Sequence, residues 1–164
     1  MGNVPTNQAP YRMLNNVEFG DRVVVEAFTN LYGCSIRDGT HIGPFVEIQR
    51  GAQIGKNCKI QSHTFICEGV EIEDEVFIGH GVIFVNDKFP RATRADGDLQ
   101  TDEDWLLLST TVRRRAAIGS GAVILGGVTI GEGALIGAGA VITKDAAAGD
   151  TIIGNPGRPL LPPT

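Results

Sequence analysis

The sequence predicts an all-β fold in which short strands wind into a triangular parallel β-helix. An aliphatic residue or Phe recurs every six positions from Ile36 to Phe84, and the count resumes from Val112 to Ile142. A small or β-branched residue follows each of these positions by four, with Lys88 as the exception. The 164 residues include 22 Gly but only 6% aromatic residues, a balance that favours a narrow interior and many turns.

A period of six is not helical, and it fits a short strand, a turn and another short strand. Side chains alternate along a strand, so the aliphatic residue and the residue four later point inward while Gly or a polar residue takes the corner. Eighteen residues then complete one triangular coil, and successive coils stack at about 4.8 Å. The six-residue positions are Ile36, Ile42, Ile48, Ile54, Ile60, Ile66, Ile72, Ile78, Phe84, Val112, Ile118, Ile124, Ile130, Ile136 and Ile142.

The repeat is interrupted once, between Phe84 and Val112. These residues are 28 positions apart, four more than a multiple of six, and the stretch between them has no six-residue pattern. Loops longer than about 12 to 15 residues inside a compact domain are usually either functional or disordered. The apolar cluster from Trp105 to Leu108 gives this loop an anchor, so we expect an ordered arm that packs on a neighbouring subunit.

We therefore expect one domain over residues 1–164, with coils at about 18–85 and 112–147, one external loop at about 86–111 and a closing segment at 148–164. The interior of such a prism is filled by aliphatic side chains, so a ligand must bind in a cleft between the outer surface and the loop.

Composition narrows the class of protein. The net charge of −5 without a basic stripe argues against nucleic acid as a partner, and no stretch approaches the 18 apolar residues of a membrane span. The N-terminus lacks a signal-peptide pattern, so we expect a cytoplasmic protein. Cys34, Cys58 and Cys67 are odd in number and lack metal-ligand spacing, so we interpret them as packing residues.

Residues 18 apart should lie above one another, which predicts a polar column beside the loop. The column holds Arg50, Glu68 and Asn86, and it continues through Gly126 to Lys144 if Val112 opens the next coil. Glycines in and beside it would let a ligand lie against the backbone. The neighbouring column reads Gly51, Gly69, Asp87 and Gly127, and His63 and His80 take other corners of nearby coils.

The segments IGKNCK, IGSGAV, IGEGAL and IGAGAV resemble the repeat unit of the hexapeptide-repeat acyltransferases, over roughly residues 18 to 147. IIGNPGRP is similar to the segment that closes the last coil in many members. The resemblance implies a left-handed coil, a homotrimer with sites between subunits, and acetyl-CoA as co-substrate with no metal. The period alone does not show the hand, since parallel crossovers are otherwise nearly always right-handed.

Two further segments, QSHTFICEG (61–69) and FIGHGVIFVNDKFPRA (77–92), resemble bacterial N-acetyltransferases that modify nucleotide-linked 3-amino sugars for surface polysaccharides such as O-antigen. One such activity acts on a UDP-linked 2-acetamido-3-amino-2,3-dideoxyglucuronate. The resemblance implies that Glu68, Asn86 and Asp87 surround the sugar and its amine as catalytic residues, with coenzyme A along the coils after the loop.

The remaining candidate residues follow from position and charge. For the nucleotide sugar we expect contacts from Arg50, Gln61, His63, His80 and Arg91. For coenzyme A we expect backbone approach at four small residues and phosphate neutralisation by two cations, namely Gly126, Gly127, Gly139, Ala140, Lys144 and Arg158.

The chemistry favours an amine acceptor. A sugar ammonium should titrate near the roughly 7.7 to 8.0 of an α-amino group, so free amine is present at cellular pH. A hydroxyl needs a positioned base, and family members that acetylate hydroxyls commonly carry His where this loop begins with Asn86-Asp87.

Three alternatives stay open. An O-acetyltransferase acting on a sugar or serine hydroxyl would need His80 or His63 as its base. A γ-class carbonic anhydrase shares the coil but would need three zinc ligands from His41, His63 and His80. A non-catalytic scaffold would use the stacked coils only as a spacer.

Overall fold

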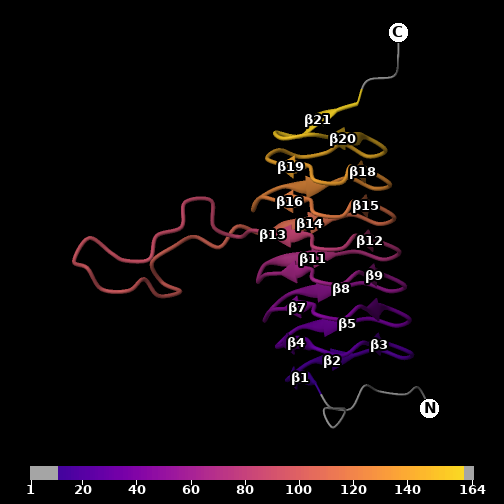
Figure 1. The fold of residues 1–164 in the computed structure, drawn as a ribbon, viewed down its shortest axis with the longest axis horizontal. Helices are drawn as coiled ribbons and strands as arrows, with labels where there is room; N and C mark the ends of the chain where they lie inside the picture. Colours follow the sequence, from indigo (N-terminus) through magenta and orange to yellow (C-terminus); the bar gives the residue numbers. More distant parts are fainter. Residues whose placement is uncertain (1–10, 161–164) are drawn as a thin grey trace.

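The computed structural model describes residues 11–160, whose short strands and turns wind into a single stack of coils (Figure 1). The stack rises from the N-terminal to the C-terminal end, and one long segment projects away from its side. The part of the chain that the structure describes contains no helix long and apolar enough to cross a bilayer.

Three sheets form the sides of the prism. Sheet A contains β1 (Arg12–Asn15), β4 (Thr29–Tyr32), β7 (Glu47–Ile48), β10 (Phe65–Ile66), β13 (Ile83–Phe84), β16 (Val123–Ile124) and β19 (Val141–Ile142). Sheet B contains β2 (Glu18–Phe19), β5 (Ser35–Ile36), β8 (Gln53–Ile54), β11 (Val70–Ile72), β14 (Thr110–Val112) and β17 (Thr129–Ile130). Sheet C contains β3 (Val24–Val25), β6 (His41–Ile42), β9 (Lys59–Ile60), β12 (Phe77–Ile78), β15 (Ala117–Ile118), β18 (Leu135–Ile136), β20 (Thr151–Ile153) and β21 (Arg158–Pro159).

The strands pair in parallel at the predicted spacing. Phe65 of β10 pairs with Glu47 below it and with Ile83 above it, one full coil of the chain in each direction. The lower coils are shorter by a single position, since Leu31 pairs with Ile48. At the top, β21 turns back antiparallel to β20 and ends the stack. Within the described residues the coils therefore begin at β1, below the first residue of the six-residue frame.

The interior is a continuous apolar column. The inward isoleucines from Ile36 to Ile142 are at most 1% exposed, and the smaller residues four positions later close the corners around them. Buried hydroxyls are satisfied, as Thr64 Oγ1 donates to the backbone oxygen of Gly79 over 3.0 Å. The core is therefore packed and leaves no internal room for a ligand.

All three cysteines are buried free thiols, as the sequence predicts. Desolvation raises the pKa of Cys34 and of Cys67 to about 11, and it also raises the pKa of Cys58. These thiols stay protonated at neutral pH and act as small packing residues.

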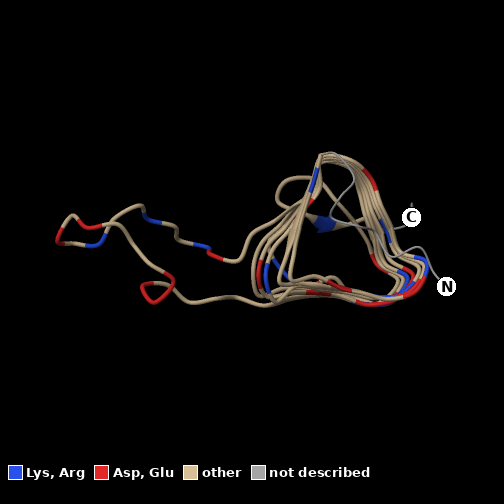
Figure 2. Cartoon of the chain, turned by 90° about the horizontal axis from the view of Figure 1, so that it is seen from below, with Lys and Arg blue, Asp and Glu red and all other residues tan. Residues whose placement is uncertain are grey.

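The corners of the coils superpose into three edges, which give the prism its triangular outline (Figure 2). The charged edge joins sheets B and C at turns 37–40, 55–58, 73–76 and 113–116. The ring edge joins sheets C and A at turns 43–46, 61–64, 79–82 and 119–122. The arm edge joins sheets A and B at turns 49–52, 67–69 and 125–128.

The ring edge carries four stacked rings in its lower part. Tyr11, Phe28, Phe45 and His63 follow one another with centroid distances of 5.0, 4.9 and 4.8 Å. Each ring stands on a residue with positive φ, and Gly81 takes the same left-handed position in the next coil up. The edge thus changes from aromatic to glycine at the level where the arm begins.

The arm comprises residues 87–109, between β13 and β14. Ile83 pairs with Val123, so the chain between these two levels is more than twice as long as in an uninterrupted coil. The two ends of the arm meet, because Leu108 N donates to Asn86 O over 3.1 Å, and a small antiparallel bridge joins Thr93 to Leu99 further out. The chain re-enters the stack in register, and the predicted external loop is confirmed.

Candidate functional site

Three polar side chains lie above one another at the arm edge, as the spacing of one coil predicts. Arg50 Nε donates to Glu68 Oε2 over 3.0 Å, and Asn86 Nδ2 donates to the backbone oxygen of Glu68 over 3.1 Å. A backbone oxygen only accepts, so this bond orients the Asn86 amide with its NH₂ toward the column. Asn86 Oδ1 accepts no hydrogen bond from residues 11–160 and is available to a ligand.

Beside this column lies a pocket of about 470 Å³. Its walls combine the arm edge, the outer side of sheet A and the arm, through Tyr32, Gln49, Arg50, Phe65, Cys67, Glu68, Asn86, Asp102 and Trp105. These walls are both apolar and charged. The pocket is the kind of cleft between prism and loop that the sequence predicts.

Sequence reasoning predicted three of these nine side chains as site residues and missed the other six, among them Tyr32, Gln49 and Asp102. Tyr32 and Gln49 occupy successive levels of sheet A. Tyr32 belongs to the shorter lower coils and falls outside the regular frame, whereas Gln49 follows Ile48 within it. Burial, and then the nearby Glu47 carboxylate, raise the pKa of Tyr32, so its phenol stays neutral. Asp102 lies far along the arm, where no repeat indicates its position, although Trp105 belongs to the predicted anchor of the arm.

Asp102 reaches back to the column and accepts a hydrogen bond from Arg50 Nη2. Arg50 therefore holds two carboxylates at once, Glu68 from its own edge and Asp102 from the arm. Both hydrogen bonds to carboxylates raise the pKa of the Arg50 guanidinium, Asp102 contributing first. The ion pair thus joins the arm to the prism at the wall of the pocket.

Asp87 does not continue the neighbouring glycine column. Its Oδ1 accepts from Phe89 N over 2.8 Å and shapes the first turn of the arm. The place above Gly69 is taken by Leu107 instead, whose Cδ1 would lie 3.2 Å from a Cβ at Gly69. The chain has already left the coil at Asp87, so the column rule no longer applies there.

The other predicted sugar contacts are not brought to this pocket within one chain. Gln61, His63 and His80 belong to the ring edge, on the far side of sheet A from Asn86. His63 stacks on Phe45, and His80 Nδ1 pairs with Ser62 Oγ at 2.8 Å. Arg91 projects from the exposed arm, where its Nη1 donates to Pro90 O.

The predicted coenzyme residues divide between three places. Gly126 and Gly127 lie above Asn86, and exposed Lys144 stands one level higher. Gly139 and Ala140 sit at the ring edge, and Arg158 lies in β21.

Two of these residues differ from the expectation that their backbones are open. A Cβ added at Gly126 would come within 2.8 Å of Leu108 Cβ, so the foot of the arm already covers this glycine. Ala140 is fully buried, its N donates to Gly137 O, and its O accepts from Val123 N. Neither backbone is free for pantetheine, whereas Gly127 is exposed and Lys88 Nζ would lie 3.6 Å from a Cβ on it.

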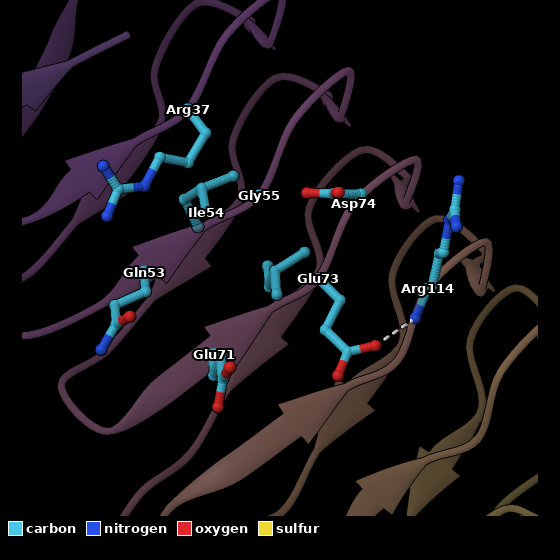
Figure 3. A pocket seen from close by; sticks show the side chains of 9 residues that line it. Arg37, Gln53, Ile54, Gly55, Glu71, Glu73, Asp74 and Arg114 are labelled. Carbon is cyan, nitrogen blue, oxygen red and sulfur yellow. Dashed lines mark hydrogen bonds between the residues drawn. The ribbon is translucent and has the colours of Figure 1, made fainter.

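A second hollow of about 270 Å³ lies on the outer side of sheet B (Figure 3). Its walls carry charges of both signs from Arg37, Glu71, Glu73, Asp74 and Arg114. Glu73 is already engaged by the Arg114 backbone N–H at 2.8 Å, the bond drawn in Figure 3. The hollow contains none of the predicted site residues, so the arm-edge pocket is the better candidate.

The histidines do not form a metal cluster in the described part of the chain. His41 lies on β6 and pairs with Glu26 Oε1 at 3.2 Å, apart from the turns that carry His63 and His80. Between residues 11 and 160 no group of three or more His, Cys, Asp or Glu side chains is placed to hold a metal ion.

The repeat matches a known sequence family. The profile described as "Bacterial transferase hexapeptide (six repeats)" matches residues 33–68, 51–86 and 109–144, together more than half of the chain. Comparison with curated protein sequences found no significant match. The fold class predicted from the sequence, a left-handed parallel β-helix of hexapeptide repeats, is confirmed by the profile and the sheet topology together.

Solved structures share this architecture. AntD, an N-acyltransferase from Bacillus cereus in complex with dTDP and coenzyme A, matches with a TM-score of 0.75 and 18% identity over 89% of this chain and 83% of that chain. A hexapeptide transferase family protein from Anaplasma phagocytophilum matches with a TM-score of 0.71 and 18% identity over 93% and 84%. GDP-perosamine N-acetyltransferase from Caulobacter crescentus, in complex with CoA and GDP-perosamine, matches with a TM-score of 0.57 and 20% identity over 93% and 55%. At these identities the likeness establishes the fold.

Proposed function

The chain belongs to the bacterial transferase hexapeptide family, and from this premise we propose that it is an acetyl-CoA-dependent N-acetyltransferase. The acceptor is the C3 amino group of a nucleotide-linked amino sugar destined for surface polysaccharide such as O-antigen. The observation that carries the proposal is the stack of Arg50, Glu68 and Asn86 inside a pocket walled by the arm. AntD, in complex with dTDP and coenzyme A, and the GDP-perosamine enzyme, in complex with its nucleotide sugar, support the acceptor class.

The groups in the pocket suit an amine better than a hydroxyl. The residues that line it include two carboxylates and two amides but, within the described chain, no His. An amine with a pKa near the roughly 7.7 to 8.0 of an α-amino group attacks in its neutral form and needs no strong base. A hydroxyl acceptor would need its proton removed during attack.

Each residue of the column has a role in the proposed reaction. Asn86 Oδ1 accepts a hydrogen bond from the amine and aims its lone pair, a positioning effect that is large when reacting atoms are held at contact distance. Glu68 attracts the ammonium form and takes the proton released when the N–C bond forms, or the departing thiolate takes it. Asp87 holds the first turn of the arm, and a backbone N–H polarises the carbonyl under attack.

Bound acetyl-CoA supplies the thioester that the amine attacks. The chain offers matching groups above Asn86, where Gly127 is exposed, Lys88 Nζ lies beside Gly127, and Lys144 stands one level higher. Lysine side chains neutralise phosphates as point charges. Lys88, the residue that breaks the repeat, therefore joins Lys144 as a candidate coenzyme contact.

A homotrimer is part of the proposal, because it would bring a neighbour's ring edge to face this arm edge. Such an arrangement reunites Gln61, His63, His80 and Gly139 with the pocket across a subunit boundary. One observation favours O-acetylation as a second candidate in that setting. His80 Nδ1 pairs with Ser62 Oγ, and Nε2 has no hydrogen-bond partner among residues 11–160, so Nε2 can act as a base.

The proposal is tested by thiol release from acetyl-CoA with a panel of UDP- and dTDP-linked 3-amino sugars, 4-amino sugars and the matching hydroxy sugars. We expect release with at least one 3-amino sugar and none with its hydroxy counterpart. His80→Asn should lower that activity only through weaker sugar binding, whereas it should abolish transfer to a hydroxyl. Absence of release with every amino sugar would overturn the proposal.

A further inference from the structure

The arm is held against the coils by a single ion pair. Among the described residues, Arg50–Asp102 is the one salt bridge that joins the arm to the prism. The other ionic contacts of the arm are internal, since Arg94 pairs with Asp96, Asp98 and Asp104. The arm's feet are fixed separately by Leu107 against Gly69 and by the Leu108 backbone bond to Asn86. Asp102 is therefore the charged contact that ties the arm to the prism between these feet, next to Trp105 in the pocket wall.

Arg50 has donors to spare in this arrangement. Its Nε donates to Glu68 and its Nη2 to Asp102, while Nη1 has no hydrogen-bond partner within residues 11–160. A guanidinium presents five N–H donors in a fork that fits a carboxylate or phosphate through two parallel bonds. Asp102 uses one nitrogen of that fork, so an anion that uses both is the better ligand.

The pair is also easily exchanged. The side chains of Arg50 and Asp102 are 57% and 71% exposed, and ion pairs in that setting are weakened by water and salt. Glu68 is less exposed, at 31%, and its bond to Arg50 keeps the guanidinium at the pocket wall when Asp102 leaves. Arg50 thus stays in place as a receptor while its arm partner is replaceable.

We propose that Asp102 is an internal stand-in for an anionic group of the acceptor. Arg50 holds Asp102 until the acceptor binds and then exchanges it for a carboxylate or phosphate oxygen of the ligand, which releases the arm. The inference rests on the proposed function for the identity of the acceptor, a nucleotide sugar. The anion has two sources in such a molecule, the diphosphate and a sugar carboxylate.

Competition between Asp102 and the ligand predicts that removing the Asp102 carboxylate increases the affinity for the ligand. The apparent affinity is reduced by the fraction of molecules in which Arg50 is occupied by Asp102, so removing the competitor strengthens binding. Asp102→Asn should tighten ligand binding by about threefold to tenfold, whereas Arg50→Met should weaken it by at least about tenfold. A residue that merely shaped the pocket or contacted the ligand would give weaker binding in both variants.

The test is calorimetric titration of the full chain with UDP, UDP-glucose and UDP-glucuronate, with Asp104→Asn as the control. Asp104 lies on the same arm but bonds to Thr101 and Arg94, and not to the prism. Tightening with all three ligands in Asp102→Asn assigns the anion to the diphosphate, and tightening with UDP-glucuronate alone assigns it to the carboxylate. Unchanged or weaker binding of every ligand overturns the proposal.

A second readout needs no catalysis and no tight ligand. Trypsin should cleave the arm after Arg91 several-fold faster in Asp102→Asn and in Arg50→Met than in the unaltered protein or Asp104→Asn. Millimolar pyrophosphate or glucuronate should accelerate cleavage of the unaltered protein in the same way. Equal cleavage rates in all variants and with both anions would overturn the proposed exchange, even if acetyl transfer is found. Because the cleavage assay does not depend on catalysis, it can be interpreted even if no acetyl transfer is detected.

Discussion

The charged edge and the arm edge are built by the same stacked turns, yet they end in opposite chemical states. At the charged edge, both oxygens of Glu73 are paired, Oε1 with Arg113 Nη1 at 2.6 Å and Oε2 with Arg114 N at 2.8 Å. Glu75 is likewise shared by the side chains of Arg114 and Arg115. At the arm edge one arginine serves two carboxylates, and Asn86 Oδ1 is left open.

The difference follows from where the chain leaves the stack. Arg113, Arg114 and Arg115 come directly after β14 and bond to glutamates of the turn that precedes the arm, so they join the coil before the arm to the coil after it. The arm edge gives up its next turn to the insertion, and its polar groups face a pocket in place of another turn. The paired charges of the charged edge keep the two coils in register, whereas the unpaired polar groups of the arm edge remain available to a ligand.

Of the changes considered, removing the Asn86 amide at the arm edge should have the largest effect, and it should act on catalytic activity. Asn86→Ala is expected to lower kcat/KM for the amino sugar by about 100-fold, because the nucleophile loses its positioning acceptor. Steady-state thiol release measures the effect. Gln53→Ala, on the outer side of sheet B, is the control and should keep its activity. Full activity in Asn86→Ala would contradict the role given to the column.

Filling the contact between arm and coil should be the largest change in stability. Gly126→Val would place side-chain atoms on Leu108 Cβ and Val85 O, both within 2.8 Å of the added Cβ. We expect a loss of about 1–3 kcal/mol in the free energy of unfolding, as in other overpacked sites. Urea denaturation measures it, and exposed Ala138→Val at the ring edge should differ little from the unaltered protein. Equal stability of both variants would show that the arm near Leu108 moves aside to accommodate the added side chain without a measurable loss of stability.

The ion pairs of the charged edge should make the stability of the protein depend on pH in the acidic range. Arg113, through its side-chain bond, lowers the pKa of Glu73, and Arg115 and Arg114 lower the pKa of Glu75. The stability from these pairs is complete above the unfolded Glu pKa of about 4.3 and is lost as the pH falls through the lower folded-state values. Glu73→Gln should therefore flatten the fall of Tm between about pH 5 and pH 3. A Tm profile parallel to that of the unaltered protein would contradict this, and Glu103→Gln on the arm is the control.

The ring edge should give the smallest effect, because among the described residues no ion pair joins its turns 43–46, 61–64, 79–82 and 119–122 to one another. Phe45→Ala loses the stacked ring and keeps a side chain at φ 58°, with an expected loss of about 0.5–1.5 kcal/mol. Phe45→Gly loses the same ring but relieves roughly 1–2 kcal/mol of left-handed strain. Glycine should thus be more stable than alanine here, the reverse of their order in strands. Urea titration of both variants decides it, and a more stable alanine variant would rule out the strain.

Much of the fold could be predicted because the period of six states directly which side chains point inward. The two lowest coils escape the frame, because their shorter spacing shifts the period. The column of Arg50, Glu68 and Asn86 was predictable, since one full coil returns the chain to the same edge. Asp102 was not, because its 52-residue separation from Arg50 depends on the path of an irregular arm. For the ring-edge histidines the frame gives the level in the stack, while the width of sheet A separates them from Asn86.

The ends of the arm touch through the bond between Leu108 N and Asn86 O, and the strands resume in register above them. The entropic cost of closing such an insertion grows only with the logarithm of its length. A longer, shorter or unrelated segment can therefore be exchanged between these two points as a cassette. The scaffold would stay folded while the recognition surface changes, which offers one physical route by which a single coil diversifies its substrates.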